Sequence, residues 1–583
     1  MVIKFGKWLT RHKAVVLIIA FLLLIPATIG YVSTRINYDL LSYLPNSLET
    51  VSGQDTMVDE FGMGAFSMVV VEDMEKKDIV ALKEKLKKVN HVEDVIWYDD
   101  AMDITVPTEM LPDKLREGLF NGNATMMIAL FDNTTSADST MDAITEMRGI
   151  VKKQAFISGM SGVVTDIKNL AMAEMPIYVV VAAVLSLLIL LLTMDSLVTP
   201  FIFLLGIGMA IVYNMGTNMV FGEISYITQA LTAILQLGVT MDYSIFLLES
   251  YEANKVRYDG DKNRAMAHAI SNTFTSVTSS SITTIAGFAA LCFMTFKLGM
   301  DLGLVMAKGV IIGVIVCLTV LPALILCFDK AIDKTTHKNL IPNLDGLSKK
   351  IVKGWPVVLV LFLVLLGPAM YGNSNYEIYY DIAGALPQSL DSAVANKKLE
   401  EKFNMNSTHI VLMKNGMASK EKSEMLKKIE DVKGVKWALG IDSFKGVSIP
   451  SSMIPKKLES KLKSDNYEIA FVCSDYKAAT DEVNSQIADI NKIVKKYSKD
   501  SMVIGEAPLT KDLQDVTDID LVNVNYVSVA AIFLIILITF KSILIPVILV
   551  MVIEFAIFLN MSVPFYTHES LPFVASIVIG TIQ

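Results

Sequence analysis

One aspartate lies inside a long apolar run of the chain, in the segment from Gln236 to Tyr243. A charged side chain costs at least about 2.5 to 3.5 kcal/mol in a membrane span, so Asp242 is by default a functional residue. Its carboxyl group could bind and release a proton, and the neighbouring Tyr243 hydroxyl could donate a hydrogen bond to the charged form. Gly238, one helical turn earlier, would let another helix approach the carboxylate. We therefore expect proton transfer at Asp242; the alternative is a carboxylate that only pairs to hold helices together.

Two further charges lie in apolar runs. Lys308 precedes Gly309 and Gly313, whose spacing is typical of closely packed membrane helices. This lysine is either a countercharge to the proton site or a side chain that extends to the nearby outer surface. Glu554 lies in the middle of another run. It is either functional, or kept neutral by burial, or paired with other helices.

A run rich in hydroxyl groups, residues 275–284, includes Ser280 and Thr284. These hydroxyls either line a wet path beside Asp242 or donate hydrogen bonds back to their own helix. The segment 261–271 before this run combines basic and apolar residues, which predicts a short helix at the membrane interface.

The absence of several sequence motifs limits the cofactors and reactions that we expect for this protein. The single Gly-Lys pair is Gly6-Lys7, so no phosphate-binding loop is present and we expect no use of ATP. Neither His-Glu-x-x-His nor Cys-x-x-Cys occurs, and all six histidines lie outside the apolar runs. We therefore predict no metal site, no cofactor and no catalytic centre. The protein is not expected to be an enzyme.

The composition agrees with a membrane location. Of the 583 residues, 53% are hydrophobic and 19% are charged, and the net charge is -9. This balance excludes a soluble enzyme, a disordered protein and a nucleic-acid binder.

Several stretches are long enough to cross a membrane, because about 20 apolar residues span a hydrocarbon core of about 30 Å. A basic segment before the first stretch is typical of a signal peptide. A near copy of that stretch is internal, however, so we interpret both as anchors. We expect nine complete spans and one that is cut short: 14–34, 175–194, 199–221, 225–249, 274–296, 302–328, 354–374, 521–540, 543–562 and a run from 570.

Lysine and arginine gather in alternate short loops: before the first span, between the fourth and fifth, and between the sixth and seventh. This pattern predicts a multi-pass protein of the plasma membrane with a cytoplasmic N-terminus and two segments outside. The first outer segment holds 24 acidic and 13 basic residues, which argues against an anionic ligand there. The expected division is 1–34 span 1, 35–174 outer domain 1, 175–328 spans 2–6, 329–353 cytoplasmic linker, 354–374 span 7, 375–520 outer domain 2 and 521–583 spans 8–10.

The sequence repeats itself. Residues 36–39 and 44–48 return at 378–381 and 386–390, an offset of 342. Prolines in 106–112 match those in 449–455, and Ser196 with Pro200 matches Ser542 with Pro546. We infer two parallel six-span repeats, the second incomplete, of the kind found in transporters.

Each outer segment has the pattern strand, helix, strand, twice, which predicts an α+β ferredoxin-like domain. The first set is 66–71, 77–89, 92–98, 126–131, 136–153 and 155–159. The second set is 408–413, 419–429, 435–439, 467–473, 478–496 and 502–505.

The Gly-x-x-x-Asp-Tyr pattern at Gly238, Asp242 and Tyr243, the six-span halves and the α+β outer domains resemble the MMPL family of the resistance-nodulation-division (RND) superfamily. The resemblance implies a proton-motive-force-driven exporter of lipids or other hydrophobic compounds, with Asp242 and Tyr243 as the proton relay. Its partners would be the membrane, protons and a hydrophobic substrate, with no nucleic acid. The runner-up is a sterol-sensing-like lipid receptor or scaffold that does not pump.

The resemblance also implies a second Asp-Tyr pair in span 10. Aligned with Gln236, Gln583 stands six positions before the expected aspartate. We therefore expect a chain cut within span 10, with about 110 residues more in the complete repeat.

Overall fold

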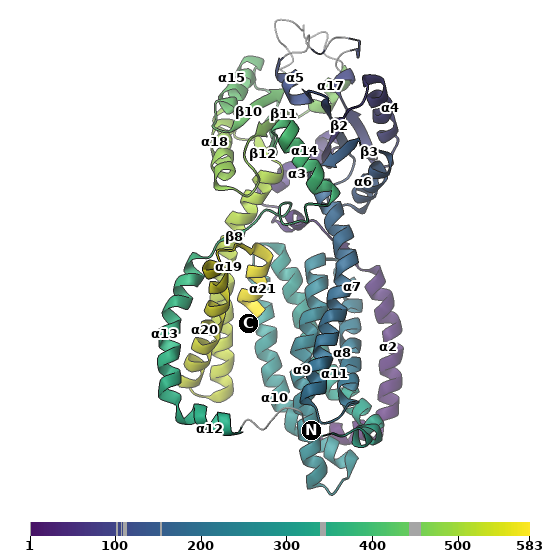
Figure 1. Cartoon of the computed structure of the whole chain (residues 1–583), viewed down its shortest axis with the longest axis vertical. Coiled ribbons are helices and arrows are strands. Elements are labelled where there is room, and N and C mark those ends of the chain that lie inside the picture. The colour runs from purple at the N-terminus through teal and green to yellow at the C-terminus, as the bar shows by residue number, and fades with distance from the viewer. Residues whose placement is uncertain are drawn as a thin grey trace. The chain divides into compact units, whose positions relative to one another are not determined.

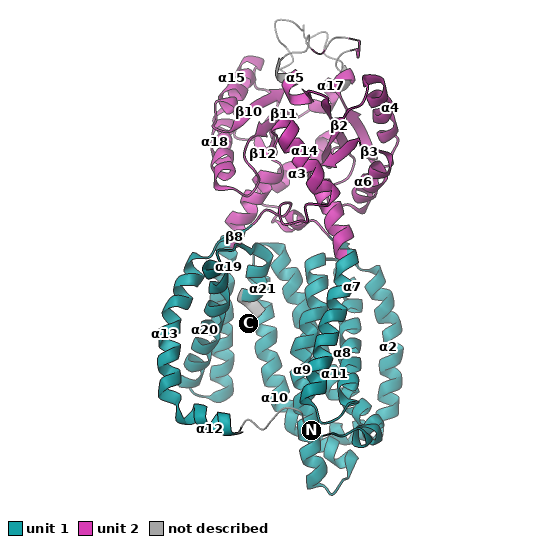
Figure 2. Ribbon diagram, viewed as in Figure 1, with its two compact units in different colours: residues 1–37, 172–379, 518–583 teal, residues 38–171, 380–517 magenta. Residues whose placement is uncertain are grey.

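The computed structural model describes residues 2–100, 103–105, 108, 113–151, 154–337, 345–441 and 456–582. The four prolines matched above at 106–112 and 449–455 lie outside these residues. The chain forms two compact units, which Figure 2 colours separately. Unit 1 contains residues 1–37, 172–379 and 518–583; unit 2 contains residues 38–171 and 380–517.

Unit 1 is a bundle of long helices (Figure 1). Among the described residues, nine helices are long and apolar enough to cross a membrane, so the protein is a polytopic membrane protein. They are α2 (Lys13–Ser33), α7 (Met160–Thr193), α8 (Thr199–Gly216, extended by η4, Thr217–Phe221), α9 (Tyr226–Arg257), α10 (Lys262–Ala290, extended by η5, Leu291–Phe293), α11 (Lys297–Lys334), α13 (Trp355–Asn375), α19 (Glu506–Phe540) and α20 (Leu544–Thr567). Shorter helices are α1 (Val2–Arg11), α12 (Asp345–Lys353) and α21 (Phe573–Ile582).

Two of these helices are longer than a membrane crossing requires. α7 has 34 residues and α19 has 35, against the roughly 20 that a bilayer core needs. Their first turns, up to residues 171 and 517, belong to unit 2. The part of α19 that could cross a membrane is therefore its apolar second part, and Glu506 at its start lies outside that part.

The expected interfacial helix at 261–271 is wrong, because the structure makes this segment the start of α10. Its apolar side chains, Met266 and Ile270 among them, are completely buried, and α10 packs on α1 here. A Cβ added at Gly6 of α1 would lie 2.8 Å from the Ala267 carbonyl oxygen. This segment therefore packs on α1, a contact that the sequence pattern did not predict, where we had expected it to lie on the membrane surface.

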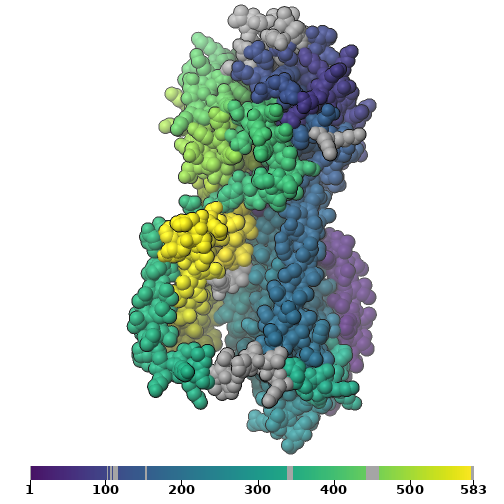
Figure 3. All heavy atoms as spheres, in the orientation of Figure 1, coloured from purple at the N-terminus to yellow at the C-terminus, as the bar shows by residue number. Residues whose placement is uncertain are grey.

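Two close helix contacts in unit 1 occur at positions that correspond to each other in the sequence repeat. In α2 against the end of α8, a Cβ added at Gly30 would lie 2.1 Å from the Gly216 carbonyl oxygen. In α13 against α20, a Cβ added at Gly372 would lie 2.6 Å from the Ser562 Cβ. Figure 3 shows a hollow on one face of unit 1 between its yellow-green and its blue-teal helices.

Two short parallel strand pairs also lie in unit 1. β1 (Arg35–Asn37) pairs with β7 (Glu223–Ser225), and β8 (Ile378–Tyr379) pairs with β13 (Leu571–Pro572). Each pair joins the residues after one apolar helix to those before another. The paired residues Ile36 and Ile224 correspond to the paired residues Ile378 and Leu571, at offsets of 342 and 347.

Unit 2 contains two antiparallel sheets (Figure 1). When the short strand β4 is left out, the order β3-β5-β2-β6 of the first sheet is the same as the order β10-β11-β9-β12 of the second, with strands numbered within each sheet. The strands are β2 (Ala65–Glu72), β3 (Val92–Ile96), β4 (Phe120–Asn121, paired with β5), β5 (Ala124–Phe131), β6 (Ala155–Ser158), β9 (Ser407–Lys414), β10 (Val435–Gly440), β11 (Tyr467–Ser474) and β12 (Met502–Ile504).

Alternation along the strands gives each sheet two apolar faces. Val69 and Val71 of β2 pack in one cluster with Ile79 of α4 (Lys76–Leu86) and Ile144 of α6 (Asp138–Val151). On the second sheet, Val411 packs with residues of α15 (Ser419–Glu430) and α18 (Asp481–Tyr497). The opposite faces, which include Leu130 and Ile410, share one cluster. The two sheets therefore meet through the faces that carry no such helices.

Two helices are exchanged between the sheets. α3 (Glu49–Phe61), from the first segment, packs on β12 of the second sheet, and α14 (Asp391–Phe403), from the second segment, packs on β6 of the first. The remaining elements of unit 2 are η1 (Leu40–Tyr43), η2 (Tyr98–Asp100), α5 (Asp113–Leu119) and α17 (Lys456–Leu462).

Candidate functional site

The start of α9, the helix that carries Asp242, is fixed by hydrogen bonds. The Ser225 hydroxyl accepts from the Ile227 backbone N–H at 3.2 Å and so caps the helix. The Asp301 carboxylate of α11 accepts from the Ser225 N–H at 2.8 Å and from the Thr228 hydroxyl at 2.6 Å. The first turn of α9 is thereby held on α11.

The glycines at 309 and 313 bring α11 close to α8 and α9. A Cβ added at Gly309 would lie 2.5 Å from the Asn214 Nδ2, and one at Gly313 would lie 2.8 Å from the Thr240 Oγ1. The Gln236 side-chain amide donates to the Gly309 carbonyl at 3.2 Å. The helix face of α9 next to Asp242 is therefore occupied by α11.

Asp242 and Tyr243 point in different directions from α9, because consecutive helical residues are about 100° apart. Tyr243 is 3% exposed and belongs to the main apolar cluster of unit 1, whereas Asp242 is exposed. Within the part of the chain that the structure describes, no hydrogen bond or ion pair involves the Asp242 carboxylate, and none joins it to the Tyr243 hydroxyl.

Gly238 lies on the same exposed face as Asp242, four residues earlier. A Cβ added there would have no neighbour within 4 Å. Gly238 and Asp242 thus form an open face on α9 that the described helices leave uncovered.

Lys308 bonds to the end of α8 and not to Asp242. Its ammonium group donates to the Asn214 carbonyl at 2.9 Å and to the Asn218 side-chain oxygen at 2.5 Å. It also donates to the Thr217 hydroxyl at 2.9 Å and lies 5.2 Å from the centre of the Phe221 ring. These contacts are those of a cation at a helix C-terminus, where free carbonyl groups need donors.

In the hydroxyl-rich run of α10, at least two side chains donate hydrogen bonds back to their own helix. Thr284 donates to the carbonyl of Ser280 at 3.2 Å, and Ser281 donates to the carbonyl of Val277 at 2.6 Å. The Ser280 side chain is exposed. Glu554 of α20 is half-buried and has no bonded partner among the described side chains.

A charged cluster that the sequence analysis did not identify joins the C-terminal ends of α9 and α11 to the first residue of α10. Asp329, 2% exposed, accepts from the Tyr251 hydroxyl at 2.7 Å and pairs with Lys255 at 3.3 Å and with Lys262. Asp333 pairs with Lys255 at 2.6 Å. The spacing of Asp329 and Asp333 on one helix face was the available signal.

Unit 2 contains a cavity of about 560 Å³, in the size range of small-molecule sites, lined by strands of both sheets and by α3 and α14. Its wall is mainly apolar and rich in methionine, a flexible side chain that adapts to ligands of different shape. The methionines are Met57, Met63, Met68, Met126, Met160 and Met405, and the aromatic residues are Phe66, Trp97, Tyr98, Trp437 and Phe471.

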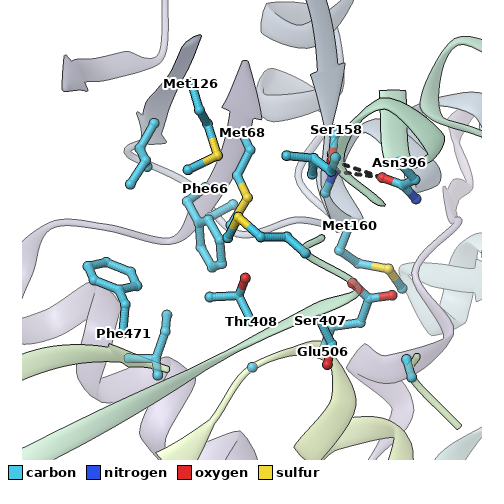
Figure 4. A pocket seen from close by; sticks show the side chains of 18 of the residues that line it. Phe66, Met68, Met126, Ser158, Met160, Asn396, Ser407, Thr408, Phe471 and Glu506 are labelled. Atoms are coloured by element: carbon cyan, nitrogen blue, oxygen red, sulfur yellow. Dashed lines mark hydrogen bonds between the residues drawn. The ribbon is translucent and has the colours of Figure 1, made fainter. Parts of the chain in front are cut away.

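Figure 4 shows how residues from both segments of unit 2 point into this cavity. Phe66 and Met68 come from β2, and Thr408 comes from β9. The Ser158 hydroxyl donates to the Asn396 side-chain oxygen at 2.8 Å at one edge. Because these residues are far apart in the sequence, motif analysis gave no sign of the cavity.

Comparison with known proteins decides the family. The sequence matches the MMPL family over residues 62–360 and 384–574, which is most of the chain. The chain belongs to the MMPL family. MMPL membership, the nine apolar helices and the transporter names of its relatives support a role in membrane transport.

Several relatives carry transport names. The apo-petrobactin exporter of Bacillus anthracis is 22% identical over 509 residues, which is 78% of this chain and 65% of that protein. "Probable transport protein MmpL12" of Mycobacterium tuberculosis is 24% identical over 289 residues, 48% of this chain and 25% of that protein. A membrane protein of Methanocaldococcus jannaschii is 23% identical over 45% of this chain and 74% of that protein. The chain thus aligns with less than two thirds of the length of the two named transporters.

Proposed function

We propose that this MMPL protein exports a hydrophobic compound, such as a lipid, and that proton movement through Asp242 drives the export. The observation that carries the proposal is a carboxylate on the open face of an apolar helix. Such a group is costly in hydrocarbon, so its presence favours a face that meets water or a proton path. A carboxyl group that alternates between charged and neutral forms would change which packing of the helices is stable.

Tyr243 is proposed to support the relay indirectly. Its ring is buried beside α9, α10 and α11, so it fixes the rotation of the helix that presents Asp242. Its hydroxyl could join a hydrogen-bonded chain when another conformation exposes it. Gly238, Ser280, Thr284 and Glu554 are proposed as supporting residues. Lys308 is proposed to hold the end of α8, given its three oxygen partners there.

We also propose that the protein consists of two parallel repeats with ferredoxin-like outer domains, divided at the boundaries given from the sequence. The common strand order of the two sheets supports this, as do the matching β1–β7 and β8–β13 pairs. In the proposed arrangement the protein lies in the plasma membrane with its N-terminus in the cytoplasm.

Everted membrane vesicles test the proton drive. Respiration acidifies their lumen, and uptake of the hydrophobic dye N-phenyl-1-naphthylamine reports export. We expect uptake that needs the gradient and that Asp242→Asn abolishes, since asparagine keeps size and polarity but cannot exchange a proton. Tyr243→Phe should lower the rate without abolishing it, because water can replace part of a hydroxyl's role.

The matched control is Glu249→Gln, which removes an exposed carboxylate from the same helix. It should transport like the wild type. Gradient-driven uptake that survives in the Asp242→Asn vesicles contradicts the relay. Dye binding that ignores the gradient in every variant supports the lipid receptor instead.

A further inference from the structure

The cavity of unit 2 has one strongly acidic end, formed where α19 begins. Glu506 is the first residue of this helix and lines the cavity, as do Asp39 and Asp381. Gly505, with φ of 124°, makes the turn from β12 that points Glu506 inward. A Cβ at Gly505 would lie 3.0 Å from the Thr408 carbonyl oxygen, so this turn is closely packed.

No described group neutralises the Glu506 carboxylate. It has no hydrogen bond and no ion pair among the described residues, and the charges that act on it are those of Asp381 and Asp39. Burial, and then repulsion from these two carboxylates, raises the pKa of Glu506 from 4.5 to about 7. Burial likewise raises the pKa of Asp39 from 3.8 to about 6.

The lysines at the cavity wall are engaged with other carboxylates. Lys461 pairs with Glu93 at 2.7 Å, and Lys477 pairs with Glu400 at 3.0 Å. The third, Lys397, has Glu401 at 3.8 Å. The net field at the Glu506 end is therefore negative, which agrees with the acidic excess of residues 35–174.

The acidic end of the cavity favours a ligand with a positive charge, and the apolar remainder of the wall favours a ligand whose other part is apolar. Among the described residues, no group of three or more His, Cys, Asp or Glu side chains is placed to hold a metal ion. An organic cation needs only one carboxylate partner, with methionine and aromatic side chains around its apolar part.

We propose that the cavity binds a hydrophobic organic cation, with Glu506 as the residue that selects its positive charge. This proposal rests on the proposed transport function, because it names the class of compound that the exporter would carry. The apolar part lies against Met68, Met126 and Phe66, and the positive centre lies at Glu506. Neutral compounds and organic anions lack the positive group that the acidic end attracts, so they should bind more weakly than a cation of the same shape.

The test uses two probes of nearly equal shape and opposite charge. Tetraphenylphosphonium and tetraphenylborate carry permanent charges, so any pH dependence of binding comes from the protein. Trp97 and Trp437 line the cavity, whereas Trp8 and Trp355, the other two tryptophans, are exposed in unit 1. In a Trp8→Phe and Trp355→Phe background, quenching of tryptophan fluorescence therefore reports binding in the cavity.

At pH 8 we expect tetraphenylphosphonium to bind at least about tenfold more tightly than tetraphenylborate, and Glu506→Gln to weaken its binding at least about tenfold. Between pH 8 and pH 5.5 the wild type should lose affinity for the cation as Glu506 takes up a proton. The Glu506→Gln variant should lose less. Asp489→Asn, which removes an exposed carboxylate of α18, is the matched control and should bind like the wild type.

Equal binding of the two probes to the wild type would overturn the proposal. Equal binding of tetraphenylphosphonium to the wild type and to Glu506→Gln would overturn it as well. Binding is measured in detergent without a gradient, so its outcome does not depend on the proton drive. Conversely, Asp242→Asn should keep wild-type binding of the probe even where it abolishes transport.

Discussion

Met160 and Glu506 occupy matching places in unit 2. Each is the first residue of a long helix, and each follows a glycine of positive φ, Gly159 at 99° and Gly505 at 124°. Both side chains line the cavity. The two turns present an apolar side chain and a carboxyl group to the same cavity, so matching backbone turns carry different chemistry.

The Glu506 carboxyl should make the folded protein less stable as pH rises. Below the ordinary pKa of 4.5 the carboxyl is protonated in both the folded and the unfolded chain, so it carries no penalty. As pH rises through about 7, the folded state must ionise a group that burial and the charges of Asp381 and Asp39 keep protonated. The loss approaches about 3 kcal/mol, from 1.36 kcal/mol per pKa unit.

We therefore expect Glu506→Gln to raise the melting temperature relative to wild type at pH 8 and to leave it nearly unchanged at pH 4.5. Thermal unfolding in detergent, followed by tryptophan fluorescence, measures the difference. Asp39 is present in both proteins, so the cost of its own burial is common to both melting curves. A difference between the two proteins that is the same at both pH values would contradict the prediction.

Local patterns predicted the long apolar helices and many of the strands, but not α1, α3 or α14. Apolar runs indicated the nine long helices found among the described residues, because a membrane crossing needs about 20 apolar residues in sequence. The short apolar runs in 66–71 and 408–413 correctly indicated strands, which the structure extends to β2 and β9. The match to the MMPL family, inferred from Gly238, Asp242 and Tyr243, is confirmed.

Contacts between distant segments could not be predicted in this way. The exchange of α3 and α14 between the sheets depends on which surfaces fit together, and periodicity says nothing about that. The cavity combines residues as far apart as Asp39 and Glu506. One sequence feature could have drawn attention to Glu506. Gly505-Glu506 lies 346 residues after Gly159-Met160, which is also the separation of Ser196 and Ser542. The roles of Asp242 and Tyr243 stay a prediction.

The surroundings of Gly313 and Gly238 in unit 1 predict that alanine has opposite effects on stability at the two positions. In Gly313→Ala the new methyl group would lie 2.8 Å from the Thr240 hydroxyl, so α11 and α9 must move apart. Overpacking of this kind costs about 1 to 3 kcal/mol. In Gly238→Ala the methyl group meets open space, and alanine favours the helix by up to about 1 kcal/mol.

Thermal unfolding of the two variants should therefore show a lower melting temperature for Gly313→Ala and an equal or higher one for Gly238→Ala. The substitution is the same in both, so helix propensity alone predicts equal shifts. Equal shifts would mean that α11 does not approach Thr240 as closely as the structure has it.

The last prediction concerns orientation in the membrane. Lysine and arginine gather at the end of α9 (Lys255, Arg257) and at the start of α10 (Lys262, Arg264), which predicts that the connection between these helices is cytoplasmic. The turn between α8 and α9, one crossing away, should then be outside. Val256, near the end of α9, and Val220, in η4 at the end of α8, suit a labelling test because they are 83% and 82% exposed.

In a background with all four cysteines replaced by alanine, Val220→Cys and Val256→Cys are treated with a membrane-impermeant maleimide. In intact cells we expect labelling of Val220→Cys alone, and after permeabilisation labelling of both. The nearly equal exposure of the two side chains removes accessibility within the protein as an explanation for any difference. Labelling of Val256→Cys in intact cells, with Val220→Cys protected, would place the N-terminus outside and reverse the direction assigned to proton movement at Asp242.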